Sequence, residues 1–257
     1  MILNRKGPAL FYQFPHLAEF NKLFHGIFTR HKGESKPPYA SLNIGFRVGD
    51  DARHVRRNRK LIQETAGVDH LVFLRQVHGS EIFVLRKDRA ADAAKALKKP
   101  PAADAVVTNL KHHGLVVQLA DCQPVLLYDP GRQVIAAVHS GWRGSLLNII
   151  GRAVERMVKD FDCTPARMYA GIGPSLGPCC GEFVNYLKEI PSIFWPYKNG
   201  DNHFNFWAIS RDQLLQAGLQ DGNIACSEIC SKCRKDQFFS YRAEGLTGRF
   251  AAVVALL

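Results

Sequence analysis

The sequence has no run of apolar residues approaching the roughly 20 that a membrane-spanning helix requires, so we expect no membrane span. It also has no internal repeat, no low-complexity tract and no linker rich enough to separate two domains. The charged residues near its start are not followed by an apolar segment, which argues against a secretory signal. We therefore predict a single domain over residues 1–257, located in the cytoplasm.

Acidic residues are scarce: 23 Asp and Glu stand against 34 Lys and Arg, giving a net charge of +11 and a pI near 9.4. The densest basic stretches, residues 53–60 and 86–99, lack the interleaved aromatic side chains that stack on single-stranded bases. We interpret the first as the solvated face of a helix and the second as an exposed insertion. The charge is therefore expected to attract small anionic or phosphorylated substrates rather than nucleic acid.

A disulfide framework is also missing, because the seven cysteines are odd in number and lack the spacing of small secreted scaffolds. We expect free thiols in a reducing compartment. The group Cys226, Cys230 and Cys233 suggests a structural zinc site, but three thiols leave such a site one ligand short, and the first spacing is not C-x-x-C. Cys179 and Cys180 would complete it only if the fold brought them there, so the role of this group stays open.

Short apolar runs outnumber helical patterns, and strands and helices do not alternate strictly, which predicts an α/β fold of the mixed α+β kind. Several runs are apolar on successive residues, as in strands covered on both faces. One helix is capped by Asp50 or Asp51 and stops at Gly67, one follows Gly144, and one runs from about Ser210 to Gly218. Strands are predicted at 9–14, 25–29, 71–74, 82–85, 105–108, 115–119, 125–128, 134–138 and 168–172, with one starting near 41 and a pairing of 238–241 with 250–254. We expect mixed sheets flanked by helices.

Three potential metal ligands, His78, Cys122 and His139, stand where predicted strands end. Strand ends are rigid, so side chains from three of them can be held at fixed distances. Glycine follows His78 directly and His139 within two residues, leaving backbone space beside each imidazole, and Pro124 predicts an interruption after Cys122. Taken singly, each residue is also compatible with a structural role, and the spacings match no compact zinc signature. Together, one thiolate and two imidazoles suit zinc or copper with a fourth position open for catalysis.

Segments around these residues resemble the YfiH-like family, also called the multicopper polyphenol oxidoreductase (laccase) family. They are Gln76-Val77-His78-Gly79, residues 103–108, Ala120-Asp121-Cys122-Gln123-Pro124 and residues 137–144. Further matches at 41–45, 58–59, 171–175, 239–242 and 247–249 extend the resemblance over nearly the whole chain. The sequence departs at Ser140, where the family more often has alanine, and at residues 86–101, an extended segment that predicts an unusual rim over the site.

The resemblance implies a fold shared with cysteine-hydrolase toxins and places the metal ligands on His78, Cys122 and His139. It implies Zn²⁺, with Cu²⁺ reported for some members. It also implies phosphorolysis of adenosine, inosine and methylthioadenosine, and deamination of adenosine. The expected partners are therefore purine nucleosides and phosphate, while the preferred nucleoside and the oligomeric state are not predicted.

Two residues beside the ligands are candidates for catalysis together with Cys122. Asp121 is either the acid/base of the reaction or the acceptor that orients a ligand histidine. Arg143 lies in a glycine-flanked segment that opens a predicted helix, where amides and a guanidinium would bind phosphate. The alternative is that these glycines permit a tight turn while Trp142 packs in the core.

Substrate contacts are predicted at four positions. Asn43 offers a carboxamide to a sugar hydroxyl or base edge, and Gln76 belongs to the segment that carries His78. Arg59 and Arg242 are candidates for phosphate or purine contacts. Each arginine is equally compatible with pairing to a buried acid.

Other functions remain as alternatives. A copper-dependent phenol oxidase is suggested by the family, although multicopper sites draw on more histidines than the two in the matched motifs, and zinc has no redox chemistry. A Cys–His hydrolase would use Cys122 with His139 and survive removal of metal. A binding module without catalytic activity is the alternative least consistent with an open metal site.

Overall fold

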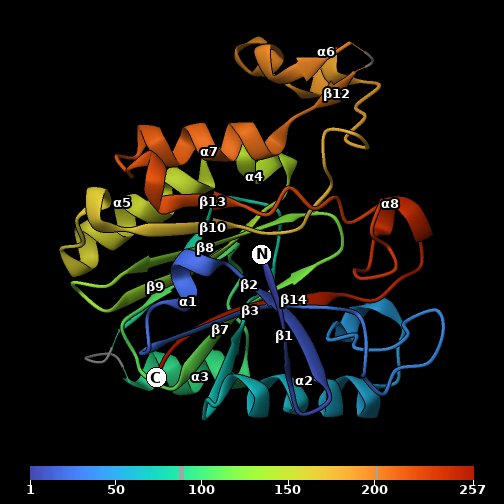
Figure 1. Cartoon of the computed structure of the whole chain (residues 1–257), viewed down its shortest axis with the longest axis vertical. Helices are drawn as coiled ribbons and strands as arrows, with labels where there is room; N and C mark the ends of the chain where they lie inside the picture. Colours follow the sequence, from blue (N-terminus) through green and yellow to red (C-terminus); the bar gives the residue numbers. More distant parts are fainter. Residues whose placement is uncertain (87–89, 201) are drawn as a thin grey trace.

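The computed structural model describes residues 1–86, 90–200 and 202–257. Two six-stranded sheets form its centre (Figure 1). The first has the order β1 (Ile2–Lys6), β2 (Ala9–Gln13), β3 (Leu23–Phe28), β14 (Phe250–Leu256), β7 (His113–Leu119) and β4 (His70–Phe73). The second has the order β13 (Ile224–Cys226), β10 (Tyr169–Ile172), β8 (Gln123–Asp129), β9 (Val134–Ser140), β6 (Ala105–Thr108) and β5 (Ile82–Leu85). A ribbon of β11 (Lys198–Asn199) and β12 (His203–Phe204) stands apart from both sheets. Parallel and antiparallel pairs occur in each six-stranded sheet, as β4 with β7 and β8 with β9 show.

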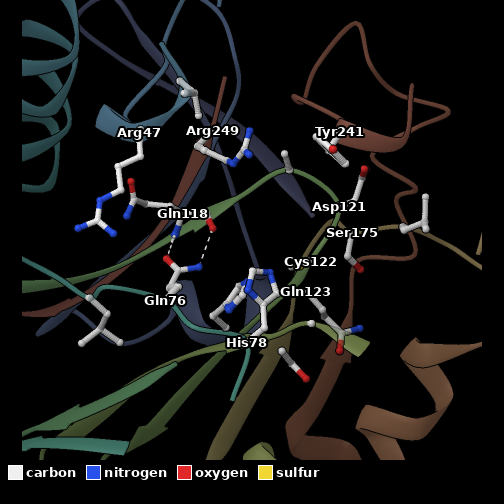
Figure 2. A pocket seen from close by; sticks show the side chains of 18 of the residues that line it. Arg47, Gln76, His78, Gln118, Asp121, Cys122, Gln123, Ser175, Tyr241 and Arg249 are labelled. Atoms are coloured by element: carbon white, nitrogen blue, oxygen red, sulfur yellow. Dashed lines mark hydrogen bonds between the residues drawn. The ribbon is translucent and has the colours of Figure 1, made fainter. Parts of the chain in front are cut away.

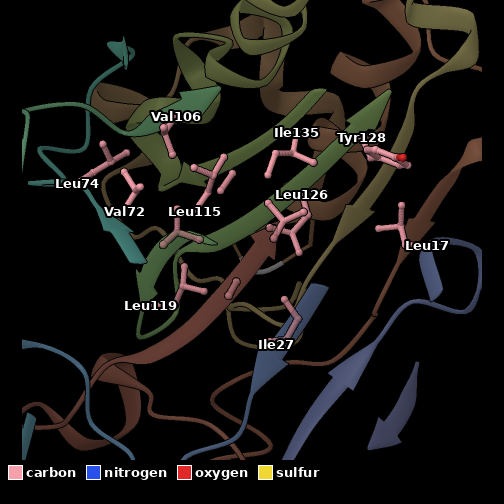
Figure 3. Close-up of a cluster of buried hydrophobic side chains, with 14 of the residues drawn as sticks. Leu17, Ile27, Val72, Leu74, Val106, Leu115, Leu119, Leu126, Tyr128 and Ile135 are labelled. Atoms are coloured by element: carbon pink, nitrogen blue, oxygen red, sulfur yellow. The ribbon is translucent and has the colours of Figure 1, made fainter. Parts of the chain in front are cut away.

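Strands that are apolar on successive residues bury both faces, because side chains alternate across a sheet. In β14, Phe250, Ala252 and Val254 join the core between the two sheets, while Ala251 and Val253 join a separate core on the outer face. Figure 3 shows the inter-sheet core, to which Leu126, Ile135 and Val106 of the second sheet contribute. The sheets therefore pack face to face with a further layer on each side.

Helices α2 (Ala52–Ala66) and α5 (Ile149–Phe161) contribute most to those outer layers. The other helices of the described chain are α1 (Pro15–Ala18), α3 (Ala90–Lys98), α4 (Trp142–Leu146), α6 (Tyr186–Glu189), α7 (Phe206–Gln216) and α8 (Tyr241–Glu244). Ile62 and Ala66 of α2 pack on the outer face of the first sheet, and Ile150, Val154 and Met157 of α5 pack on the second (Figure 1).

The predicted fold class, mixed α/β sheets flanked by helices, is confirmed. Asp51 caps α2 by accepting a hydrogen bond from the Arg53 amide, and Gly67 ends it with a φ of 69°. The boundaries of a single domain stay a prediction.

Three local expectations were wrong. Residues 41–46 form turns rather than a strand, since Asn43 accepts hydrogen bonds from the Gly45 and Arg249 amides. Residues 238–241 do not pair with β14, whose neighbours are β3 and β7. The helix predicted from Ser210 begins at Phe206, because Asn205 caps it by accepting from the Ala208 amide.

The basic insertion predicted at 86–99 lies partly outside the described residues, and α3 occupies most of the remainder. Where the structure describes the chain, no helix is long and apolar enough to cross a membrane.

Candidate metal centre and active-site cavity

The three predicted ligands come together from three segments. His78 follows β4, Cys122 occupies the turn between β7 and β8, and His139 lies within β9. One donor atom from each lies within 4.8 Å of the others. Pro124 does not interrupt the chain as expected: it lies inside β8, opposite His139. The cluster therefore depends on the side-by-side pairing of β8 and β9.

Asp104 fixes the position of two of these segments. Its carboxylate accepts hydrogen bonds from the amides of Val77, His78 and Gly79, and it lies 2.9 Å from His139 Nδ1. The residue precedes β6 and faces His139 across the antiparallel pair, whose backbone is joined by a 2.7 Å bond from the His139 amide to the Asp104 carbonyl. With Nδ1 engaged by the carboxylate, His139 directs its other ring nitrogen toward Cys122.

This network sets the charge of the cluster. Burial opposes charge on Cys122, but the nearby imidazoles of His139 and His78 outweigh it and lower the pKa of the thiol to about 6. Burial also disfavours an imidazolium at His139, yet Cys122 and Asp104 raise its pKa to about 9. Burial would raise the pKa of Asp104, but its hydrogen bonds with His139 and the amides lower it. Near neutral pH the cluster therefore holds a thiolate beside an imidazolium.

The backbone around the cluster is shaped for close approach. A Cβ on Gly141 would lie 3.1 Å from His78 Cδ2 and 3.3 Å from Cys122 Sγ, so any side chain there would crowd both donors. His78 and Asp121 have φ values of 60° and 87°, in the region that non-glycine residues rarely adopt. The His78 amide is held by Asp104, and the Asp121 carbonyl accepts from the Leu176 amide.

The cluster lies on the wall of a cavity of about 840 Å³ (Figure 2). Its lining is strongly positive: among the described residues, six lysines or arginines line it against the single carboxylate of Asp121. The cationic residues are Arg47, Arg59, Arg75, Lys99, Arg242 and Arg249. Lys99 and Pro100, at the end of the segment for which an unusual rim is predicted, are among the lining residues. Aromatic side chains also line the cavity, namely Phe46, Phe73, Trp142, Phe183, Phe206 and Tyr241.

Arg59 is the most enclosed of these cations. Its guanidinium lies 3.6 Å from the Phe73 ring centroid and 4.3 Å from that of Phe46, and burial lowers its pKa to about 10. It donates to the Ile44 carbonyl and to Gln118 Oε1. The ion pairs found in the described chain include none with Arg59, so the pairing with a buried acid considered from sequence does not occur there.

The two predicted amide contacts are both engaged by the protein. Gln76 donates to the Gln118 carbonyl and accepts from the Gln118 amide, as the dashed lines in Figure 2 show. It lines the cavity, but its carboxamide acts as a strand partner for β7. Asn43 is fully buried, donates to Asp50 and is absent from the cavity lining. The structure places this side chain outside the cavity lining, where it organises the turn beside Arg249, and a substrate contact at Asn43 stays a prediction.

The predicted phosphate residue Arg143 does not join the other cations at the cavity. Its side chain is exposed, lies 4.4 Å from the Trp142 ring centroid and is absent from the cavity lining, so a phosphate contact there stays a prediction. Arg242 does line the cavity, donating from its side chain to the Glu182 carbonyl and from its amide to Asp121.

Asp121 is held by two short hydrogen bonds, from Ser231 Oγ and from the Arg242 amide, each 2.6 Å long. The histidine-orienting role considered for it belongs to Asp104 instead. Its carboxylate lines the cavity near Tyr241 (Figure 2).

Sequence reasoning did not assign a role to Asp104, Gln118, Arg47, Arg75 or Arg249. A signal for Asp104 was present: it precedes a buried strand as an isolated acid, and buried charges are paired. The arginines carry no such signal, because only the fold separates cavity cations from surface ones.

The chain matches the profile of a family described as multi-copper polyphenol oxidoreductase laccase over residues 24–257. It is 34% identical over 242 residues to purine nucleoside phosphorylase YlmD of Geobacillus stearothermophilus, covering 89% of this chain and 88% of that relative. It is 30% identical over 239 residues to purine nucleoside phosphorylase YfiH of Escherichia coli, covering 89% and 92%. Crystal structures of Geobacillus stearothermophilus YlmD and of a hypothetical protein YfiH from Bacillus licheniformis both align with a TM-score of 0.87 at 30% identity. They cover 99% of this chain, and 98% and 99% of their own chains.

Proposed function

This chain belongs to the multi-copper polyphenol oxidoreductase laccase family, and we propose that it is a metal-dependent purine nucleoside phosphorylase. The observation that carries the proposal is the cavity: a His–Cys–His cluster lies in its wall, and six cationic side chains oppose one carboxylate. Relatives more than 30% identical over nine-tenths of the chain are named purine nucleoside phosphorylases, which supports the same activity here.

The metal proposed is Zn²⁺, held by His78, Cys122 and His139. The donor set fits, because one thiolate and two imidazoles with a free fourth position is a ligand set found in catalytic zinc sites. The lowered pKa of Cys122 supplies the thiolate, and Gly141 leaves the space. When bound, zinc supplies a Lewis acid and an acidified water.

The remaining residues bind and orient the reactants. Phosphate is expected among Arg47, Arg59 and Arg249. Among the described residues Arg59 has no carboxylate partner, and Arg249 uses one guanidinium nitrogen on backbone carbonyls. The aromatic side chains offer apolar faces to a purine ring. A phosphate oxygen would attack the ribose carbon that bears the base as the carbon–nitrogen bond breaks, and the departing base must gain a proton.

Asp121 is proposed to handle that proton, as the carboxylate that lines the cavity. Asp121→Asn should leave the metal content intact and lower turnover by about 10²-fold or more, the usual contribution of a general acid or base. Unchanged turnover would assign Asp121 to loop structure alone, through Ser231 and Arg242.

The direct test is incubation of purified, metal-quantified protein with adenosine, inosine or methylthioadenosine, with and without phosphate, followed by separation of products. Free base and ribose 1-phosphate that appear only with phosphate support phosphorolysis. Conversion of adenosine to inosine without phosphate would instead show deamination, with water attacking the purine carbon that bears the amino group. No product from any nucleoside would overturn the proposal.

A second candidate is hydrolysis by Cys122 and His139, because a thiolate beside an imidazolium is the resting state of cysteine hydrolases. Chelation separates the two: a zinc-dependent phosphorylase loses activity and regains it with added zinc, whereas a thiol hydrolase retains it. Phenol oxidation would require the same site to hold copper, and copper-loaded against zinc-loaded protein tests that activity.

A further inference from the structure

Four cysteines, two of them exposed, gather in a second cluster that is separate from the three donors at the cavity. The sulfur atoms of Cys179, Cys180, Cys230 and Cys233 all lie within 4.8 Å of one another. Two of the separations are 3.6 Å, between Cys179 and Cys233, and 3.5 Å, between Cys180 and Cys233. Cys226, which the sequence grouped with Cys230 and Cys233, is not part of this cluster.

We propose that these four thiolates bind one zinc ion as a structural site. A tetrahedral zinc with Zn–S bonds of about 2.3 Å separates its sulfur ligands by about 3.8 Å, close to the spacings found. Four protein ligands leave no position for water or substrate, which is the mark of a structural rather than a catalytic zinc site.

The backbone is arranged to present the sulfurs to one point. Cys230 and Cys233 have the C-x-x-C spacing, and Cys179 and Cys180 occupy a turn in which the Cys180 amide donates to the Gly177 carbonyl. The Gly177 amide lies 3.3 Å from Cys230 Sγ and donates to it, a bond that stabilises a thiolate. A Cβ on Gly177 would lie 2.6 Å from the Trp207 ring and 3.1 Å from Cys230 Cβ, so glycine is required for this approach.

The site would join two irregular segments beside the cavity. The first follows β10 and contributes Ser175 and Leu176 to the cavity lining, and the second follows β13 and leads into α8, whose Tyr241 and Arg242 line the cavity. They are paired through the Ser175 amide to the Ile229 carbonyl and the Ser231 amide to the Ser175 carbonyl. Ser231, between Cys230 and Cys233, donates to the Asp121 carboxylate. The second metal would therefore stabilise the segment that holds Asp121 in place.

The test is metal stoichiometry on protein purified under reducing conditions, incubated with excess Zn²⁺ and desalted. Elemental analysis should give two zinc ions per chain for the unaltered protein and for Cys226→Ser, the matched control outside the cluster. The double variant Cys230→Ser with Cys233→Ser should retain one. The loss of one zinc ion between the unaltered protein and the double variant supports the proposal, whatever the occupancy of the cavity site, and equal zinc content in the two proteins would overturn it.

Should the double variant fail to fold, Cys122→Ser decides the question, because it removes the cavity thiol alone. Loaded with Co²⁺, this variant should bind one ion with the intense sulfur-to-cobalt charge-transfer absorption of four thiolates. Loss of that absorption, or a disulfide within the cluster found in freshly purified protein, would overturn the proposal. Neither readout uses nucleoside turnover, so these experiments test the second site independently of the proposed activity.

Discussion

The two cysteine-containing clusters differ in donors and in surroundings. At the cavity, one thiol and two imidazoles are supported by the carboxylate of Asp104, and a metal held by these three donors would have a coordination position open. In the second cluster, four thiols on two loops are supported by a backbone amide, and a metal held by these four donors would have none. The first arrangement suits chemistry on a bound ligand, and the second suits the joining of flexible segments. Donor count, rather than the presence of cysteine, distinguishes the two roles.

The largest expected effect is the loss of turnover when the cavity cluster is changed. Cys122→Ser should lower phosphorolysis by about 10³-fold, since catalytic metals stabilise transition-state charge by several kcal/mol. Cys226→Ser should leave the rate within a factor of about two, because its thiol belongs to neither cluster. Initial rates with inosine and phosphate measure both. Comparable loss in the two variants would mean that thiol chemistry outside the cavity matters.

A smaller effect, on zinc affinity, is expected when Asp104 beside the cavity cluster is changed. Asp104→Asn removes the charge that orients His139 and part of the acceptor for three amides, so zinc affinity should fall by about 10- to 100-fold. Asp129→Asn is the matched control, since this buried acid accepts from the Arg132 and Thr164 amides and not from a ligand histidine. Competition with a chelator of known affinity measures the change. Equal affinities would remove Asp104 from the metal site.

The charge state of the two clusters offers a pH test on metal-free protein. Cys122 should react with iodoacetamide with a midpoint near pH 6, whereas Cys180, whose pKa is raised to about 11, chiefly by burial, should stay slow throughout neutral pH. Peptide mass spectrometry after timed alkylation reports each site. Equal rates at pH 7 would contradict the thiolate–imidazolium pair.

The same pair links stability to pH. The folded pKa of Cys122 lies below its usual value, so its contribution is lost as pH falls through about 6. The folded pKa of His139 lies above its usual value, so its contribution is lost as pH rises through about 9. The metal-free protein should therefore gain most from this pair between those limits.

The smallest expected effect lies at the link between the clusters. Ser231→Ala removes a buried hydrogen bond to the Asp121 carboxylate and should lower the free energy of unfolding by about 1–2 kcal/mol, with metal content unchanged. Ser227→Ala, in the same segment but away from Asp121, should cost less. Urea unfolding measures both free energies. An equal loss in the two variants would show that the hydrogen bond from Ser231 to Asp121 does not stabilise the fold.

Local pattern was informative wherever a residue's role follows from its neighbours in the chain. The runs that became β7, β8, β9 and β14 were visible because buried strands are apolar on both faces. The α2 helix could be bounded because Asp51 and Gly67 act within one turn of it. Residues 41–46 were misassigned because their hydrogen bonds lead to Arg249, about 200 positions away.

By itself, the sequence determined the fold class and the family, and it singled out the three residues whose side chains meet at the cavity, since these rest on periodicity and on motifs that stay contiguous in the chain. Only the tertiary structure decided that Asp104 rather than Asp121 contacts His139, that Arg249 lines the cavity while Arg143 does not, and that Cys179 and Cys180 meet Cys230 and Cys233. The physical reason is that these relations join segments distant in sequence, through strand register and loop packing that no local pattern encodes.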